Sequence, residues 1–217
     1  MSNYILKYSR DDRVKYISHL DFVRLFHRTI RRTGMNFMFS QGFNPHPIMT
    51  VAQPLSVGVT SDSEYMKVGF DGDYSDEEVV ETINNSFPPG YKILAAKRVE
   101  GKEIDLTKLD RAVYTVEVEY EGDYDIDALL ANKELKVMKK SKSGIKESDI
   151  RPYIYSIEKI ADENGILTLK MCLSVGSTYN LKPESVIDAM EKYCDNFKAG
   201  FMNVHRNSMM HGNREFL

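Results

Sequence analysis

The repeated order of predicted elements limits the fold of this chain more than any other feature of its sequence. In the first stretch, alternating apolar residues predict strands at 3–9, 48–52, 63–70 and 91–99. Apolar residues at helical spacing predict helices at 19–33 and 75–87. The same strand–helix–strand–strand–helix–strand order returns at 111–120, 125–133, 134–140, 166–173, 182–194 and 200–206. A charged, weakly patterned segment, 100–110, separates the two stretches.

Two βαββαβ orders in tandem predict an α+β protein built from two ferredoxin-like units with antiparallel sheets. We therefore expect one ferredoxin-like domain at 1–100 and a second at 111–217. The segment 141–165 is longer than a hairpin between two strands of one sheet requires. It is expected to hold an extra strand at 153–160 or a functional loop.

The ends of two predicted helices carry clear sequence signals. Ser18 is a candidate N-cap for helix 19–33, and Gly34 is a natural C-terminal stop because glycine adopts positive φ readily. Ser75 and Glu78 have the spacing of a capping box, which predicts a helix start at this point.

The net charge of −3 is unevenly distributed along the chain. Residues 1–55 hold eight basic and three acidic side chains, so this part carries +5 and the remainder carries −8. Local potential steers association more than total charge does. The asymmetry indicates that the first quarter of the chain has an anionic partner.

Cysteine usage and hydropathy bear on the cellular compartment. Cys172 and Cys194 are far apart and form no C-x-x-C motif, so neither a disulfide framework nor a zinc ribbon is indicated, and two reduced, mostly buried thiols are expected. No run approaches the roughly 18 apolar residues of a membrane span, and the N-terminal residues lack the apolar region of a signal peptide. We expect a cytoplasmic protein.

Helix 19–33 carries a stripe of arginines. Arg24, Arg28 and Arg31 fall within about 60° of one another around the helix axis, with His27 and Arg32 beside them. A guanidinium group is always charged and can bind two phosphate oxygens at once, so the stripe predicts an RNA or DNA phosphate contact. The alternative is an ordinary solvated helix face, although only one acid lies on the helix to pair with the cluster.

The segment SQGFNPHP, 40–47, predicts a stiff loop because two prolines restrict its backbone and Gly42 permits positive φ. Phe43, Asn44 and His46 would then be held on a rigid turn, where an aromatic ring can stack on a base and polar groups can bond to its edge. The alternative is a structural turn in which Phe43 packs inward.

His19, Asp21 and His46 are the candidate acid–base residues of the chain. Their spacing does not predict a metal site, because no third ligand lies at a recognised interval. The sequence also lacks the common phosphate-loop, dinucleotide-binding and serine-hydrolase motifs.

Four blocks in the first third of the chain resemble one protein family. They are Y-I-S-H-L-D at 16–21, R-R-x-G at 31–34, S-x-G-F-N-P-H-P at 40–47 and P-L-S-V-G-V-x-S-x-x-E-Y at 54–65. These blocks resemble the bacterial radical SAM-associated (radical SAM-linked) protein family, a domain of unknown function that is fused to, or encoded beside, radical SAM proteins.

The resemblance implies a stand-alone accessory of a radical SAM enzyme that acts on RNA, as in tRNA modification. The chain has no cysteine triad for an iron–sulfur cluster, so it is expected to carry no cofactor of its own. The 4Fe-4S cluster and S-adenosylmethionine would sit on the partner. The family motif marks a set of positions for testing: His19, Asp21, Arg24, Arg28, Gly42, Phe43, Asn44, Pro45, His46 and Glu64.

Three functional hypotheses follow from these features. The leading one is an accessory RNA-binding or substrate-presenting module without catalytic activity of its own, whose partners are a radical SAM protein and RNA. The second is an RNA-processing or RNA-modifying enzyme with His19, His27 or His46 as general base, by analogy with the tandem ferredoxin-like CRISPR RNA-processing proteins. The third is a purely protein-binding adaptor.

Overall fold

A computed structural model describes residues 2–100, 105–141, 144–176 and 179–217. The chain divides into two units: unit 1 holds Met1–Leu109 and Ser208–Leu217, and unit 2 holds Asp110–Asn207. The expected domains, 1–100 and 111–217, differ from this division mainly at the C-terminal end, where the last residues belong to unit 1. Both units mix helices with antiparallel strands, so the chain is an α+β protein.

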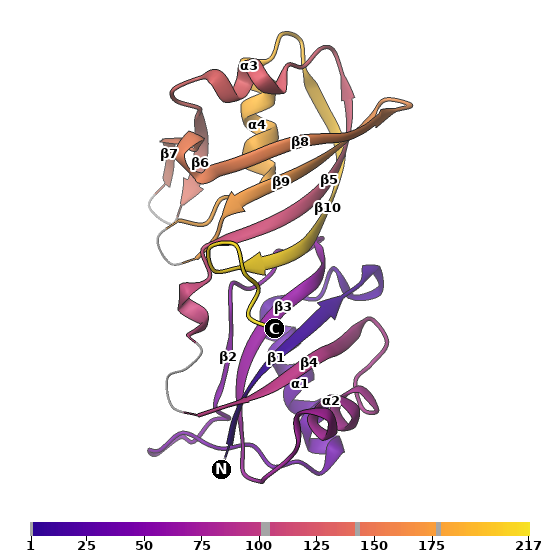
Figure 1. Ribbon diagram of the computed structural model, residues 1–217, viewed down its shortest axis with the longest axis vertical. Helices are drawn as coiled ribbons and strands as arrows, with labels where there is room; N and C mark the ends of the chain where they lie inside the picture. Colours follow the sequence, from indigo (N-terminus) through magenta and orange to yellow (C-terminus); the bar gives the residue numbers. More distant parts are fainter. Residues whose placement is uncertain (1, 101–104, 142–143, 177–178) are drawn as a thin grey trace. The chain divides into compact units, whose positions relative to one another are not determined.

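Unit 1 contains helices and strands in the predicted order (Figure 1). They are β1 (Ser2–Arg10), α1 (His19–Thr33), β2 (Met49–Val51), β3 (Thr60–Phe70), α2 (Asp76–Asn84) and β4 (Tyr91–Val99), with short 3-10 turns at Asp12–Val14 and Leu106–Lys108. The strands run in the order β4-β1-β3, and β2 pairs with β3. Each of these pairings is antiparallel.

The predicted helix ends of unit 1 are confirmed. The Ser18 side chain accepts a hydrogen bond from the Asp21 backbone N–H, and Gly34 ends α1 with a φ of 79°. Ser75 and Glu78 form the full capping box of α2. These caps satisfy backbone groups that have no partner inside the helix, so they fix where each helix begins and ends.

The core of unit 1 lies between the sheet and its two helices. Every second residue of β1 from Tyr4 to Tyr8 faces this core, as the two-residue period of a strand requires. The apolar side of α1 packs against that face through Phe22, Phe26 and Ile30. Because this side is buried, the arginine side of the same helix faces solvent.

The C-terminal residues of the chain pack on unit 1. Phe216 meets the buried ring of Tyr65 edge-on, with ring centroids 6.0 Å apart. Lys7 forms an ion pair with Glu215 and donates a hydrogen bond to the Leu217 carbonyl. These contacts explain why residues 208–217 belong with β1 and β3 in the same unit.

Unit 2 repeats the general pattern with one rearrangement. Its elements are β5 (Arg111–Glu121), α3 (Ile126–Ala131), β6 (Lys136–Ser141), β7 (Gly144–Asp149), a 3-10 turn (Arg151–Tyr153), β8 (Ile154–Glu163), β9 (Ile166–Ser174), α4 (Pro183–Tyr193) and β10 (Lys198–Met210), whose last residues, from Ser208 on, belong to unit 1. The main sheet has the order β10-β5-β9-β8, and β6 pairs with β7 in a separate two-stranded sheet.

The expectation that 134–140 is the second strand of this sheet is wrong. β8, which overlaps the expected extra strand 153–160, takes that place beside β9, whereas β6 joins a hairpin outside the main sheet. The reason is burial and pairing: β8 buries Ile154 and Ile157 and pairs with β9 along most of its length. Both segments alternate like strands, so the sequence pattern alone did not separate them.

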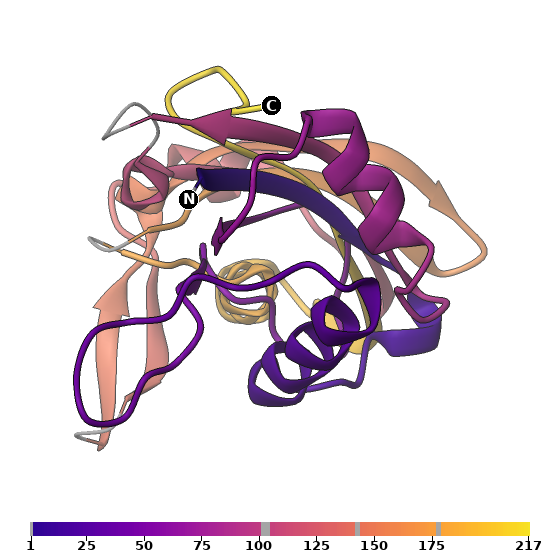
Figure 2. The same cartoon turned by 90° about the horizontal axis from the view of Figure 1, so that it is seen from below.

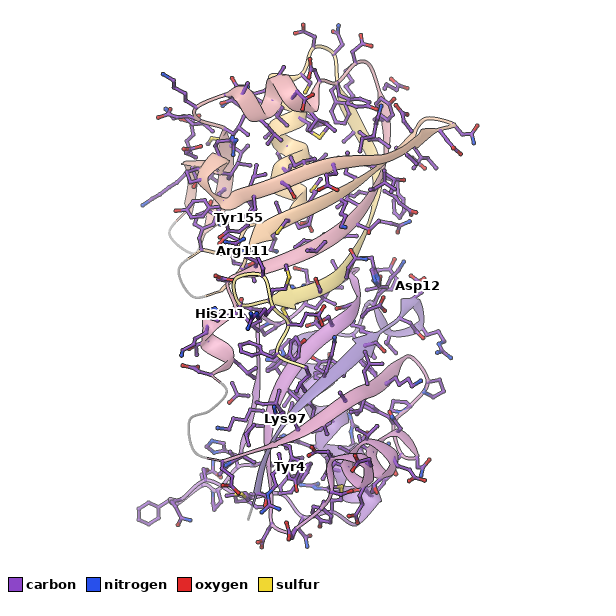
Figure 3. The ribbon with its side chains drawn as sticks, viewed as in Figure 1. Tyr4, Asp12, Lys97, Arg111, Tyr155 and His211 are labelled. Carbon is purple, nitrogen blue, oxygen red and sulfur yellow. The ribbon has the colours of Figure 1, made fainter. Side chains whose placement is uncertain are left out.

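One face of the unit 2 sheet is polar and includes acids. Glu117 and Glu119 project from β5 and are exposed. At the other end of β5, Arg111 lies over the ring of Tyr155, 4.2 Å from its centroid (Figure 3). The acids oppose phosphate binding on this face in the manner of an RNA-recognition motif.

Two further observations concern the thiols and membrane spans. Cys172 and Cys194 are free and half-buried, and burial raises the pKa of the Cys172 thiol. In the described part of the chain, no helix combines the length and the apolar character that crossing a membrane requires.

Candidate functional site

The solvent side of α1 carries three exposed arginines, Arg24, Arg28 and Arg31, called here the arginine face. Arg24 forms a 3.1 Å ion pair with Asp21, one turn earlier on the helix. Among the described residues, no carboxylate lies within ion-pairing distance of Arg28 or Arg31. The face therefore keeps at least two guanidinium groups available for an anion, because an exposed pair such as Arg24–Asp21 is weak and easily exchanged.

Asp21 belongs to the cap of α1. Its carboxylate accepts a 2.7 Å hydrogen bond from the Ser18 hydroxyl. That hydrogen bond, followed by the Arg24 and Arg28 guanidinium groups, holds the pKa of Asp21 below its usual value. The carboxylate therefore stays ionised at neutral pH. This suits an anion that stabilises a helix N-terminus better than it suits a proton donor.

Arg32 and His27, which were expected beside the arginine stripe, also make contacts within unit 1. The Arg32 guanidinium donates a 2.7 Å hydrogen bond to the Ser86 carbonyl, which links the end of α1 to the segment after α2. The His27 ring lies edge-on against Phe37, with centroids 5.3 Å apart. Burial, and then the nearby Arg31 charge, lower the pKa of His27, so this histidine is neutral at pH 7.

The lowered pKa of His27 predicts a specific pH dependence. As the pH falls below about 6.5, unfolded chains take up a proton that the folded chain resists, so stability decreases towards acid. Replacing His27 with glutamine should flatten this decrease, measured as urea midpoints between pH 7.5 and 5.5. Equal pH slopes in the variant and the parent would contradict the assignment.

The segment 40–47, the Phe43 loop, is a closed turn that exposes its tip. The Ser40 backbone N–H donates to the His46 carbonyl at 2.9 Å, and the Ser40 hydroxyl lies 3.0 Å from His46 Nδ1. Gly42 has a φ of 129°, which explains the need for glycine at this turn. Phe43 is fully exposed, so the alternative in which its ring packs inward is wrong. Figure 2 shows the loop, in dark purple, extending away from α1.

A small pocket lies under the first turn of α1, within unit 1. The space inside it that a water-sized molecule can reach is about 10 Å³, which is room for a single water. The walls comprise residues of the 51–55 segment together with Tyr8, Arg10, His19, Phe22, Glu64 and Tyr91. We call it the Arg10 pocket.

Strand register explains how the Arg10 pocket forms. Arg10 on β1 pairs with Tyr91 on β4, and Tyr8 pairs with Glu64 on β3, so all four side chains share the core face of the sheet. Arg10 is 5% exposed and Glu64 is 1% exposed, which places a buried cation and a buried acid at the polar end of an apolar core. The Arg10 guanidinium also donates hydrogen bonds to the carbonyls of Lys15 and Ile17.

The candidate acid–base residues lie in different settings. His19 lines the Arg10 pocket, Asp21 caps the exposed start of α1, and His46 is exposed in the Phe43 loop. No hydrogen bond or ion pair of the described residues joins any two of them. The described ranges also contain no group of three or more His, Cys, Asp or Glu side chains arranged to hold a metal ion.

Arg10 and Tyr91 are the pocket residues that sequence reasoning missed, although a signal was present. In β1, Arg10 continues the two-residue series Tyr4, Leu6, Tyr8 and therefore occupies a core-facing position. A charged residue in the phase of a buried strand face is unusual and is a sign of a built polar site.

Comparison with known proteins identifies the family. A family model described as "Uncharacterized protein conserved in bacteria (DUF2344)" matches residues 3–183. The chain belongs to the DUF2344 family. The matched range includes the arginine face, the Phe43 loop and every residue of the Arg10 pocket. No curated protein matches this DUF2344 chain.

Solved structures add a likeness of fold. A chain from the "Crystal Structure of a Cbf5-Nop10-Gar1 Complex" matches 94% of this DUF2344 protein with a TM-score of 0.51 and 8% identity. The DUF2344 chain spans 47% of that protein's length. An unknown protein from Galdieria sulphuraria (12% identity, 94% and 98% coverage, TM-score 0.27) also matches. A structure described as a "putative glycine cleavage system transcriptional repressor" matches with 13% identity, coverage of 95% of this chain and 98% of that chain, and a TM-score of 0.25. The TM-scores of these last two structures are too low to indicate a shared fold.

Proposed function

We propose that this DUF2344 protein is an RNA-binding module without catalytic activity of its own. The observation that carries the proposal is the arginine face, where Arg28 and Arg31 are exposed on a rigid helix with no acid paired to them among the described residues. Guanidinium groups held side by side repel one another unless an anion lies between them, and phosphate oxygens suit their geometry. The face would hold the backbone of the nucleic acid.

The Phe43 loop would supply the contact to a base. An aromatic ring that is fully exposed at the tip of a closed turn buries nothing in the free protein. Stacking on an unpaired base would cover this ring, and stacking tolerates any base because each one has a π-face. Unpaired RNA is therefore a better ligand than a regular duplex, in which the bases are not accessible for stacking.

We also propose that each unit is ferredoxin-like. Strand orders β4-β1-β3-β2 and β10-β5-β9-β8 are supported by the pairings, and each corresponds to a βαββαβ chain with β6 and β7 as an insertion in the second unit. Such a scaffold holds a helix face rigidly, which favours phosphate contacts from fixed positions.

The proposed partner is a radical SAM enzyme that modifies RNA, tRNA being the first candidate. This part of the proposal rests on the sequence blocks at 16–21, 31–34, 40–47 and 54–65 and on their resemblance to the radical SAM-associated family. In this arrangement the partner carries the 4Fe-4S cluster and S-adenosylmethionine, and the present chain presents the RNA.

Photochemical cross-linking tests the location of the RNA. The full chain would be irradiated with single-stranded RNA, digested, and analysed by mass spectrometry for RNA-linked peptides. We expect cross-links in peptides that contain α1 or the Phe43 loop. Cross-links confined to unit 2, or none at all, would overturn the proposal.

Replacing Phe43 with alanine should weaken binding of single-stranded RNA by about 1–3 kcal/mol without changing stability. The ring makes a large contact only in the complex, because it is fully exposed in the free protein. Fluorescence anisotropy measures the affinity and thermal unfolding measures the stability. Phe201→Ala is a matched control, because Phe201 is an exposed aromatic on unit 2, and it should bind RNA like the parent. Equal affinities for all three proteins would remove the loop from the interface.

A further inference from the structure

The sheet of unit 1 has a second face, turned away from α1, that carries four lysines. Lys67 on β3 and Lys97 on β4 both pair with Ile5 of β1. Tyr4 and Leu6, the neighbours of Ile5 on β1, belong to the core under α1, so Ile5 and the two lysines project from the opposite face. The register places two more lysines there, and we call the set the lysine face: Lys7, Lys67, Lys92 and Lys97.

The lysine face has an excess of positive charge. Lys92 and Lys97 are exposed and Lys67 is half-buried, and none of the three forms an ion pair with a described residue. Asp105 attracts Lys67 only weakly, because its carboxylate accepts a hydrogen bond from Thr107. One strand separates Lys67 from Lys97, which places their backbones about 10 Å apart. An extended acidic chain can reach both amines.

One end of the lysine face is occupied by the chain itself. The Glu215 carboxylate forms an ion pair with Lys7 and accepts a 3.4 Å hydrogen bond from the Tyr65 hydroxyl. The Phe216 ring meets the Tyr65 ring edge-on. Figure 2 shows the C-terminal segment, in yellow, and α1 on opposite sides of β1. A carboxylate followed by an aromatic ring is therefore the kind of peptide that this face accepts.

The setting of Lys7 requires an acid at this place. Burial lowers the pKa of Lys7, but the hydrogen bond to Glu215 and further contacts with Tyr65 outweigh that effect and raise it. The Lys7 side chain is 18% exposed, so removal of Glu215 would leave a largely buried cation without an anionic partner. A segment that replaces residues 215 and 216 must bring a carboxylate of its own.

We propose that the lysine face is the docking surface for an acidic segment of a protein partner that carries an aromatic residue and displaces Glu215 and Phe216. Charge complementarity supports an acidic occupant, because the C-terminal segment pairs with only one of the four lysines. A protein is favoured over RNA because the ligand seated on this face is a carboxylate with a ring beside it.

This inference goes beyond the proposed RNA binding and does not depend on it. The arginine face lies on α1, which packs on the core side of the sheet, whereas the lysine face is on the other side. One unit can therefore hold RNA on one side and a protein on the other.

The test titrates the full chain with a labelled synthetic peptide that is rich in glutamate and has phenylalanine beside the acids. The double variant Glu215→Gln, Phe216→Ala uncovers the face, so it should bind this peptide about tenfold more tightly than the parent does. A peptide with glutamine in place of every glutamate should bind neither protein. Equal affinities of parent and double variant, or of the two peptides, would overturn the proposal.

Lysine variants locate the peptide on the sheet. Lys67→Ala with Lys97→Ala should weaken peptide binding about tenfold, because two charge contacts are lost. Lys97→Glu, at the exposed position labelled in Figure 3, should weaken it without affecting the fold. Lys133→Ala with Lys198→Ala is the matched control, since both are exposed lysines of unit 2. An equal loss in the control would mean that the peptide responds to total charge, and the proposal would be wrong.

Single-stranded RNA, titrated into the same proteins, separates this inference from the proposed function. The variant that lacks Lys67 and Lys97 should bind RNA like the control that lacks Lys133 and Lys198. A specific loss of RNA affinity in the first variant, without peptide binding by the parent, would assign the lysine face to RNA and overturn the protein docking surface alone. Peptide binding without any RNA binding would overturn only the proposed function.

Discussion

Replacing Arg10 with methionine is expected to lower the free energy of unfolding by roughly 3 kcal/mol or more. The buried guanidinium donates hydrogen bonds to the carbonyls of Lys15 and Ile17, which hold the segment that leads into the Ser18 cap of α1. Methionine preserves the unbranched stem but offers no donor. The change also removes the positive charge from a pocket that contains the buried carboxylate of Glu64.

Thermal and urea unfolding followed by circular dichroism measure this effect, and a decrease in melting temperature of about 10 °C is expected. Arg13→Met is the matched control, because Arg13 is exposed and its ion pair with Asp11 lies at the surface. That variant should change stability by less than about 1 kcal/mol. An Arg10 variant as stable as the Arg13 control would show that the guanidinium does not hold the entry to α1.

Replacing Arg24, Arg28 and Arg31 together with alanine is expected to weaken tRNA binding by two orders of magnitude or more near physiological salt. Each lost phosphate contact should reduce the slope of log K against log salt by about 0.9. The variant should fold normally, because the three side chains are exposed and alanine has the highest helix propensity. Anisotropy with labelled tRNA across a salt series measures both quantities.

A second triple variant controls for total charge. Lys92, Lys97 and Lys108 are exposed lysines of unit 1 that lie outside α1. Their joint replacement with alanine removes the same formal charge as the arginine variant. An equal loss of affinity in both variants would mean that RNA responds to overall charge and that no specific arginine face exists.

Local signals predicted the arginine face from the sequence. Ser18 and Gly34 set the limits of α1, and the apolar residues Phe22, Phe26 and Ile30 fixed which side would be buried. Burial of one side of a helix determines the exposure of the other, so a periodic pattern was sufficient. The roles of His27 and Arg32 were not predictable in this way, because their partners Phe37 and Ser86 come from other elements.

Long-range pairing decided the part of the fold that the sequence did not reveal. Segments 134–140 and 153–160 both alternate like strands, and their local propensities do not indicate which one joins the main sheet. β8 takes that position because its pairing with β9 extends from Ile154 to Glu163 and buries apolar side chains. A single sequence contains no direct record of such pairing.

The Arg10 pocket was predictable from the sequence in one respect and not in another. Side chains alternate between the two faces of a strand, and this alternation indicates that Arg10 and Glu64 face a core. That much could be read from the sequence. Their meeting with Tyr91 depends on the register of three strands, which only the folded chain defines. The candidate catalytic residues show the same limit, because the fold separates His19 from His46 into different settings that their spacing did not indicate.

The salt dependence of tRNA binding by the full chain tests the central claim most directly. Fluorescence anisotropy would give affinities over a range of salt concentrations. We predict binding at low salt with a log–log slope of about −2 or steeper, since Arg28, Arg31 and the exchangeable Arg24 each add a phosphate contact. No binding at low salt, or a slope near zero, would contradict the account, and the arginine face would then be a docking surface for an acidic protein.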